Sequence, residues 1–153
     1  DVDLDKGESY RESDYFQGGN KLALADIDVT KLGLTICYDV RFSYLYRALA
    51  KAGAGIIAVP AAFTVPTGEA HWEVLLRARA IETGSFILAP AQTGEHEGGR
   101  KTWGHSLIIS PWGKILAEAG AGKEIIYADL DLAELRKARN SIPALRHDKE
   151  FSF

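Results

Sequence analysis

Two short runs dominated by apolar residues, separated by a helical pattern, restrict most strongly what this chain can fold into. Residues 55–60 (GIIAVP) and 85–91 (SFILAPA) predict strands of the kind found inside a sheet that helices cover. Between them, the spacing predicts a helix that Thr67 caps and that ends near Gly84. Its apolar face would carry Val74, Leu75, Ala78 and Ile81. A strand–helix–strand crossover of this kind indicates an α/β fold with layers.

The rest of the chain adds further strands and helices around this unit. Strands are predicted at residues 22–27, 32–37, 104–110, 114–119 and 124–129. Helices are predicted over residues 42–52, ended by Gly53, and from about Asp131 onward. Residues 1–20 and 94–101 predict loops, and residues 110–113 (SPWG) predict a tight turn between two strands. The mixture of crossovers and hairpins favours a mixed sheet.

Composition narrows the class of protein. The 153 residues are enough for one domain with a real core. A formal charge of −3 gives no long-range attraction to nucleic acid or an anionic membrane, so neither is an expected partner. The single cysteine permits no intrachain disulfide, which fits a reducing, cytoplasmic location. The chain begins at Asp1 and has no methionine, so we interpret it as part of a longer polypeptide; maturation or trimming is the alternative.

Cys37, that only cysteine, stands where the run 33–42 (GLTICYDVRF) changes from a strand pattern to a helix pattern. A thiol at the positive N-terminal pole of a helix is favoured as the thiolate, which is the nucleophilic form. Free cysteines are also among the residues most often buried, so a structural role is the alternative for a lone Cys37. The position of Cys37 therefore indicates covalent catalysis but does not decide between a nucleophilic and a structural role.

Other groups give weaker signals. Four histidines, at positions 71, 96, 105 and 147, are candidate bases, but none stands in a local signature of a Cys–His protease. No His/Cys pair has the spacing of zinc ligands, and we predict no metal site and no cofactor. Residues 94–102 have the glycines of a phosphate-binding loop, but the spacing differs by one residue and a strand follows instead of a helix. By composition alone, Glu8, Glu12 and Asp14 form a solvated acidic loop.

Several motifs in order carry a resemblance to a known family. CYDVRF at 37–42 resembles the nucleophile segment of the nitrilase, or carbon–nitrogen hydrolase, superfamily. Six further motifs resemble one branch of it, the ω-amidases that hydrolyse deaminated glutathione. They are PAAFT at 60–64, TG at 67–68, HWEVLLRARAIE at 71–82, AQTG at 91–94, GHS at 104–106 and PWG at 111–113. The resemblance covers essentially the whole chain, and the ordered set is far more specific than any single motif.

The resemblance implies an αββα sandwich of the nitrilase type, with mixed sheets flanked by helices, whose N-terminal part is missing here. It also implies a Glu–Lys–Cys catalytic set. Cys37 would be the nucleophile that attacks an amide carbonyl, and the Tyr38 N–H would contribute to the oxyanion hole. Glu12 would match a second glutamate that helps to position the substrate and the lysine. The base glutamate and the lysine would lie before Asp1, because neither Lys6 nor Lys51 has the matching context.

Three further residues are predicted to bind substrate. Arg41 could pair with a substrate carboxylate, or could instead form an internal salt bridge with Asp39 or a loop acid. Phe63 and Thr64 follow the C-terminal end of a predicted strand, where ligand pockets of α/β proteins form. One departure from the family is Ser43-Tyr44, where proline and an acid are usual.

The leading hypothesis is that residues 1–153 are the C-terminal portion of a cytoplasmic amidase. It would hydrolyse a small carboxylate-bearing ω-amide such as deaminated glutathione through a cysteine thioester, and would be inactive without the upstream residues. A homo-oligomer, dimeric or larger, is expected. The alternatives are a non-catalytic, shortened interaction module, and a nitrilase or carbamoylase of the same superfamily.

Overall fold

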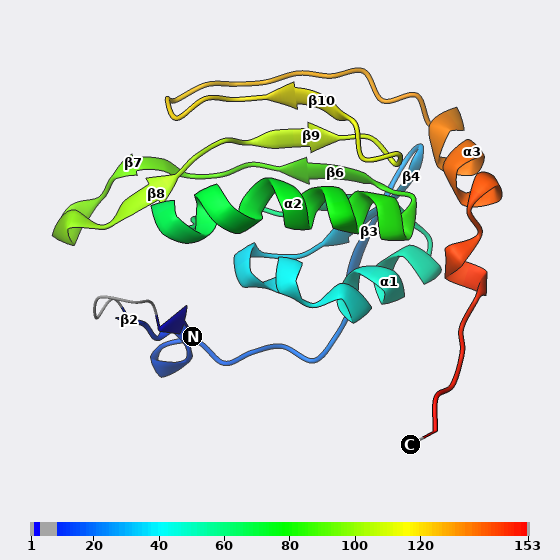
Figure 1. Ribbon diagram of the computed structural model, residues 1–153, viewed down its shortest axis with the longest axis horizontal. Helices are drawn as coiled ribbons and strands as arrows, with labels where there is room; N and C mark the ends of the chain where they lie inside the picture. The colour runs from blue at the N-terminus through cyan, green and yellow to red at the C-terminus, as the bar shows by residue number, and fades with distance from the viewer. Residues whose placement is uncertain (1, 4–8, 153) are drawn as a thin grey trace.

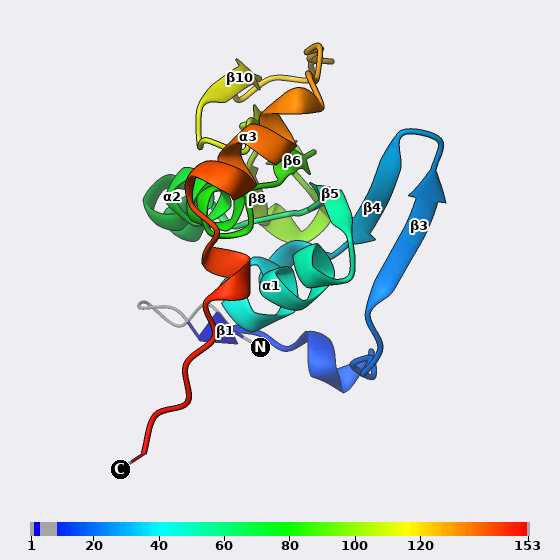
Figure 2. The ribbon, with the colours of Figure 1, turned by 90° about the vertical axis from the view of Figure 1, so that its right-hand side faces the viewer.

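One six-stranded mixed sheet forms the centre of the protein. The computed structural model describes residues 2–3 and 9–152 (Figures 1 and 2). The strand order is β10–β9–β6–β5–β4–β3. In chain order the strands are β3 (Ala23–Ile27), β4 (Thr30–Leu34), β5 (Ala54–Ala58), β6 (Phe86–Ala89), β9 (Leu107–Ile109) and β10 (Ile115–Glu118). The pairs β4–β5 and β5–β6 are parallel and the other pairs are antiparallel, which confirms the predicted mixed α/β architecture.

Two helices cover one face of this sheet: α1 (Ser43–Lys51) and α2 (Val65–Thr83) (Figure 1). The strands present alternate residues to them, as the two-residue period of a strand requires. Ile57, Ile87 and Ile109 are fully buried in the core that the sheet shares with α1 and α2. Their neighbours Ile56 and Phe86 point to the other face, where they form a second cluster with Leu135 of α3 (Ala133–Ser141).

Several predicted elements are confirmed with small changes in their bounds. The β3–β4 hairpin forms as predicted and extends away from the rest of the chain (Figure 2). Helix α2 ends at Gly84, whose φ of +55° suits a residue without a side chain. Residues 110–113 form the predicted turn, closed by a bond from the Gly113 N–H to the Ser110 carbonyl.

Several predictions about local structure are wrong. Helix α2 begins at Val65, with Thr64 in the capping position, so Thr67 lies inside its first turn. Its buried residues are Gly68, Trp72, Leu76, Arg79, Ala80 and Thr83, whereas Val74 and Ile81 are exposed. Residues 124–129 form no strand, and Ile125 and Tyr127 are exposed there.

Residues 93–103, predicted as a loop up to residue 101, form a two-stranded ribbon of β7 (Thr93–Glu95) and β8 (Lys101–Trp103) around the short helix η3 (Glu97–Gly99). At the start of the chain, β1 (Val2–Asp3) pairs with β2 (Ser9–Tyr10), and the 3₁₀ helix η1 (Glu12–Asp14) follows. A short helix η4 (Ala144–Arg146) precedes the C-terminal tail. Among the described residues, no helix has the length and apolar character needed to cross a membrane.

Candidate active site

Cys37 occupies a sharp turn that leads from β4 into the 3₁₀ helix η2 (Cys37–Arg41). Its φ of +45° lies in the left-handed region. Non-glycine residues rarely adopt this conformation, which costs about 1–3 kcal/mol. The Cys37 N–H donates to the Pro60 carbonyl at 2.8 Å, which ties the turn to the chain just after β5. The thiol therefore lies beyond the C-terminal ends of two adjacent parallel strands, where α/β proteins place their ligands.

Two charged side chains hold this turn. The Asp39 carboxylate accepts the Ile36 N–H at 2.9 Å, and the Ile36 carbonyl accepts the Asp39 N–H at the same distance. From α2, the Nε of Arg79 donates to the Val40 carbonyl at 2.8 Å, although Arg79 is only 6% exposed. Its Nη1 reaches the half-exposed Glu82 carboxylate at 2.6 Å. A buried cation is thus bound directly to the backbone of the segment that carries Cys37.

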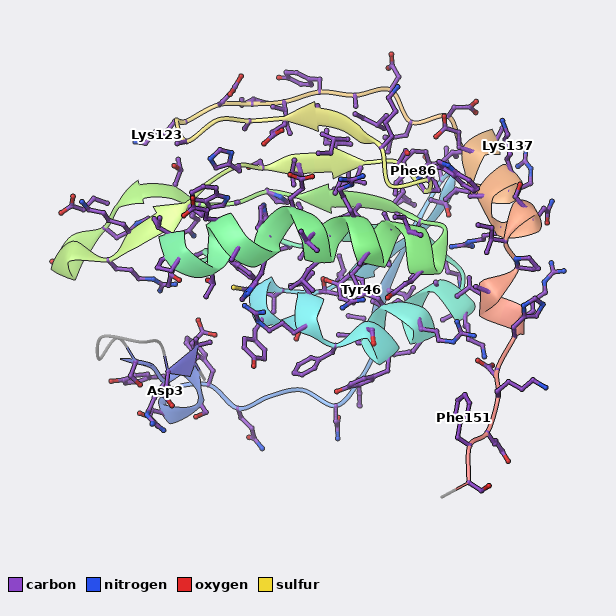
Figure 3. All side chains as sticks on the ribbon, in the orientation of Figure 1. Asp3, Tyr46, Phe86, Lys123, Lys137 and Phe151 are labelled. Carbon is purple, nitrogen blue, oxygen red and sulfur yellow. The ribbon has the colours of Figure 1, made fainter. Side chains whose placement is uncertain are left out.

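A buried tyrosine fixes the strand just before the turn. The Tyr46 hydroxyl is 2.8 Å from the Thr35 hydroxyl, which itself donates to the Ala58 carbonyl at 2.8 Å. Tyr46 therefore donates to Thr35, and burial raises the pKa of the Tyr46 hydroxyl, which keeps it protonated. The Arg79 guanidinium lies 5.8 Å from the centre of the Tyr46 ring, and Figure 3 shows Tyr46 lying between α1 and α2. Arg79 thus supports both ends of the Cys37 segment.

Replacing Arg79 with methionine is expected to lower the free energy of unfolding by about 1–3 kcal/mol, because the buried Val40 carbonyl loses its donor. Glu82 is half-exposed and can be hydrated, so it adds little to this cost. The control is Lys137→Met on the exposed face of α3; we expect a change below about 0.5 kcal/mol there. Urea unfolding of both variants measures the difference, and equal losses would contradict a special role for Arg79.

All six residues predicted for the site line a single pocket: Glu12, Cys37, Tyr38, Arg41, Phe63 and Thr64. The pocket is completed by Val2, Ala62, Thr67 and Arg100. These residues come from β1, η1, η2, the β5–α2 connection, the first turn of α2 and the β7–β8 ribbon. Segments that are distant in sequence therefore meet around the Cys37 thiol.

The surroundings of the thiol favour its protonated form. Burial raises the pKa of Cys37 above its ordinary value, and the Glu12 carboxylate raises it further. Hydrogen bonds from the backbone N–H groups of Ala62 and Tyr38, and the charge of Arg100, act in the opposite direction. The expectation that a helix pole would favour the thiolate is wrong here, because Cys37 opens a short 3₁₀ helix and the cost of burying a charge is larger. A base is therefore needed to activate the sulfur.

The Arg41 guanidinium lies among aromatic side chains. Its guanidinium lies 5.3 Å from the ring centres of both Tyr38 and Phe63, and its Nη1 is 3.4 Å from Nδ1 of His71. Asp39 is engaged with the backbone of Ile36, and no ion pair of Arg41 with a carboxylate occurs within residues 2–3 and 9–152. The structure therefore does not contain the alternative, an internal salt bridge between Arg41 and Asp39.

Phe63 and Thr64 form the wall of the pocket where the chain enters α2. Phe63 is 6% exposed and packs on Trp72 with ring centres 4.9 Å apart. The hydroxyls of Thr64 and Thr67 are 2.9 Å apart, so Thr67 binds the side chain of the capping residue instead of capping the helix itself. The hydroxyl-bearing first turn of α2 thus borders the pocket.

Sequence reasoning missed Ala62 and Arg100. Ala62 belongs to the PAAFT motif at 60–64, but its side chain carries no chemistry, and Arg100 stands in the glycine-rich stretch that was dismissed as a phosphate loop. Of the lysines considered, Lys51 lies at the end of α1 and pairs with Asp148, away from the pocket, and Lys6 lies outside the described residues. In the described part of the chain, no cluster of three or more His, Cys, Asp or Glu side chains could hold a metal ion.

The fold and the cysteine-centred pocket agree with a family assignment from sequence. Residues 2–140 match the carbon–nitrogen hydrolase family, and the chain belongs to that family. It is 49% identical over 150 residues to the deaminated glutathione amidase of Yersinia enterocolitica, covering 97% of this chain and 52% of that protein. It is 47% identical over 151 residues to the deaminated glutathione amidase of Dictyostelium discoideum, with the same coverage of each. The chain thus spans about half the length of these curated relatives.

Solved structures show the same architecture. The NitFhit protein of C. elegans superimposes with a TM-score of 0.89 at 38% identity, over 97% of this chain and 36% of that one. Nit3 of Saccharomyces cerevisiae, a member of branch 10 of the nitrilase superfamily, superimposes with a TM-score of 0.82 at 37% identity. That match covers 86% of this chain and 49% of Nit3. The predicted nitrilase-type fold is confirmed, and the protein is related to enzymes that hydrolyse carbon–nitrogen bonds.

Proposed function

We propose that this chain is the nucleophile-bearing, C-terminal portion of an amidase that hydrolyses a small carboxylate-bearing ω-amide. Deaminated glutathione is the first substrate to test, because two relatives at 47–49% identity are named deaminated glutathione amidases. The observation that carries the proposal is the pocket itself, in which the strained Cys37 thiol and the Arg41 guanidinium face the same space. One group can attack an amide carbon while the other binds a carboxylate.

In the proposed reaction, the Cys37 sulfur loses its proton to a base and adds to the amide carbon. The new carbon–sulfur bond makes a tetrahedral oxyanion, to which the Tyr38 N–H would donate. Collapse restores the carbonyl and breaks the carbon–nitrogen bond, and the nitrogen takes a proton and leaves as ammonia. Water then adds to the thioester and releases a carboxylic acid and the Cys37 thiol.

The protonated resting thiol explains why this chain would need further residues to act. The pKa of Cys37 is raised, so the proton must be removed as the sulfur attacks. Glu12 is exposed and belongs to η1; its proposed role is to position substrate. The resemblance assigns the base to a glutamate, and the charge stabilisation to a lysine, in the portion before Asp1. Activity is therefore to be tested in the full-length gene product.

The role of Arg41 gives the sharpest test of substrate class. We expect Arg41→Met in the full-length protein to raise KM for the ω-amide about 10–100-fold, because a charge-assisted bond worth about 1.5–3 kcal/mol is lost. The same amide with its carboxylate esterified to a methyl group is the matched substrate, and its KM should not change. Ammonia release measures both.

Two outcomes would contradict the proposal. If the full-length protein releases no ammonia from any carboxylate-bearing ω-amide, the amidase assignment is overturned in favour of a non-catalytic module. If Arg41→Met lowers turnover of the acid and of the ester equally, Arg41 supports the fold and does not select a carboxylate. Product analysis identifies a carbamoylase, since a carbamoyl amine gives an amine, ammonia and carbon dioxide. A nitrile and a primary amide both give a carboxylic acid and ammonia, so a nitrilase is distinguished by comparing the rates on an amide and on the matching nitrile.

A further inference from the structure

The β7–β8 ribbon is a tight hairpin that turns Arg100 back toward the site. Its strands pair from Thr93 with Trp103 to Glu95 with Lys101. At its tip, the His96 N–H donates to the Arg100 carbonyl at 2.8 Å. Two consecutive glycines at the tip have φ values of +82° and +81°, a left-handed conformation that lets the chain reverse. Arg100 is therefore the first residue after the reversal and has a fixed backbone position.

The returning strand of this ribbon is fastened to the wall of the pocket. The Trp103 N–H donates to the Phe63 carbonyl at 2.9 Å, and Thr102 forms an antiparallel bridge with Thr64. The ring of Trp103 packs so closely on Gly68 of α2 that a Cβ there would lie 2.3 Å from it. The strand that begins just after Arg100 is thus held on two sides.

From this position, Arg100 reaches Ala62, the residue whose N–H faces the thiol. Its Nη2 donates to the Ala62 carbonyl at 2.8 Å, and its side chain is partly buried. Arg100 lines both of the pockets that Cys37 lines. The N–H of Ala62 itself donates to the Cys37 thiol, and the positive charge of Arg100 lowers the thiol pKa against the larger effect of burial.

We propose that Arg100 is a positioning residue for the nucleophile: by binding the Ala62 carbonyl it fixes the backbone at Ala62, whose N–H, in the preceding peptide, faces the Cys37 sulfur, and it places a positive charge beside that sulfur. A role of Arg100 in catalysis rests on the proposed function. Its effect on the reactivity of the Cys37 thiol does not depend on that function. Two donors, the N–H groups of Ala62 and Tyr38, then stabilise negative charge on the sulfur before attack. Fixed dipoles and a fixed cation are effective here because they need no reorganisation as charge develops.

The test is the pH dependence of Cys37 alkylation by iodoacetamide in the full-length protein, followed by mass spectrometry of the Cys37 peptide. In Arg100→Gln, we expect the midpoint of the alkylation profile to rise by about one pH unit, because a nearby opposite charge shifts a pKa by that order. The rate at neutral pH should fall about tenfold, because only the thiolate reacts. Arg100→Lys keeps the charge, and its midpoint should lie closer to the wild type than to the glutamine variant.

The matched control is Lys101→Gln, which removes one positive charge from the neighbouring residue of the same strand. Lys101 is exposed and its nearest acid is Glu95 at 3.6 Å, so the Cys37 profile should not move. An unchanged midpoint in Arg100→Gln, or an equal shift in Lys101→Gln, would overturn the proposal. A lysine variant that titrates like the glutamine variant would overturn the role of the charge. If Cys37→Ala retained amide hydrolysis, the proposed function would fail while the Arg100 result still stood.

Discussion

Replacing Cys37 with alanine in the full-length protein is expected to reduce ammonia release from the ω-amide by at least about 10³-fold. No other side chain in the pocket can form the proposed acyl intermediate at comparable rate, because the remaining lining groups are a carboxylate, arginines, hydroxyls and apolar side chains. Cys37→Ser keeps the size and the hydrogen-bonding capacity of the side chain, so it separates the need for sulfur from the need to fill the turn. We expect it to be nearly as inactive as alanine, because a serine hydroxyl is far less acidic than a thiol and a base suited to a thiol activates it poorly.

Both Cys37 variants should remain folded. The strain of a positive φ is common to cysteine, serine and alanine, so none of the replacements adds to it. Thermal unfolding should therefore change little, and Asp26→Asn on the exposed edge strand β3 serves as a control with unchanged activity and stability. Full activity in either Cys37 variant would contradict the proposed nucleophile.

Trapping the acyl intermediate on the protein would also identify the nucleophile. Rapid acid quenching of the wild-type protein with substrate should give a Cys37 peptide whose mass has increased by that of the acyl group, and the alanine variant should give none. An acyl group on any other residue would assign the chemistry elsewhere. The measurement depends on the intermediate accumulating, so it is best made below the pH at which the thioester is hydrolysed rapidly.

The features that sequence predicted well are those set by neighbouring residues along the chain. The buried strands β5 and β6, the β3–β4 hairpin and the left-handed end of α2 at Gly84 follow from apolar runs and turn residues. The position of Cys37 after a strand was also visible in the sequence. The roles of Glu12 and Tyr38 came from the family resemblance, whereas Arg41, Phe63 and Thr64 were predicted from charge and from their place after a strand. The structure brings all six predicted site residues around one pocket.

The features that sequence missed depend on packing between distant segments. The partners that bury Arg79, the Val40 carbonyl and the Tyr46 ring, lie in other segments of the chain, so the sequence of α2 does not identify them. The apolar residues of α2 occur on two sides, so periodicity selected Val74 and Ile81, which are exposed. The sign of the pKa shift at Cys37 followed burial, which a linear pattern of residues does not reveal.

The largest expected loss of stability comes from Trp72→Ala. Trp72 is 1% exposed and belongs to the core that α2 shares with the sheet. Truncating a buried tryptophan to alanine lowers the free energy of unfolding by about 3–5 kcal/mol, because the burial of the indole's apolar surface is lost and a cavity remains. Its Nε1 also donates to the His105 carbonyl at 2.8 Å, so that carbonyl loses its partner as well. Trp72→Phe keeps most of the packing and should cost less than half as much, which isolates the packing contribution.

The same change should reach the site, because Trp72 supports its wall. Phe63 packs directly on Trp72, and the guanidinium of Arg41 lies 5.3 Å from the centre of the Phe63 ring. At a temperature where Trp72→Ala is still folded, we therefore expect KM for the ω-amide to rise more than turnover falls, since binding depends on where Phe63 and Arg41 lie. Trp112→Ala is the matched control, because that indole is 62% exposed on the β9–β10 turn and should change stability by less than about 1 kcal/mol. Similar losses at Trp72 and Trp112 in urea unfolding, or an unchanged KM in Trp72→Ala, would show that the core does not hold the pocket wall in place.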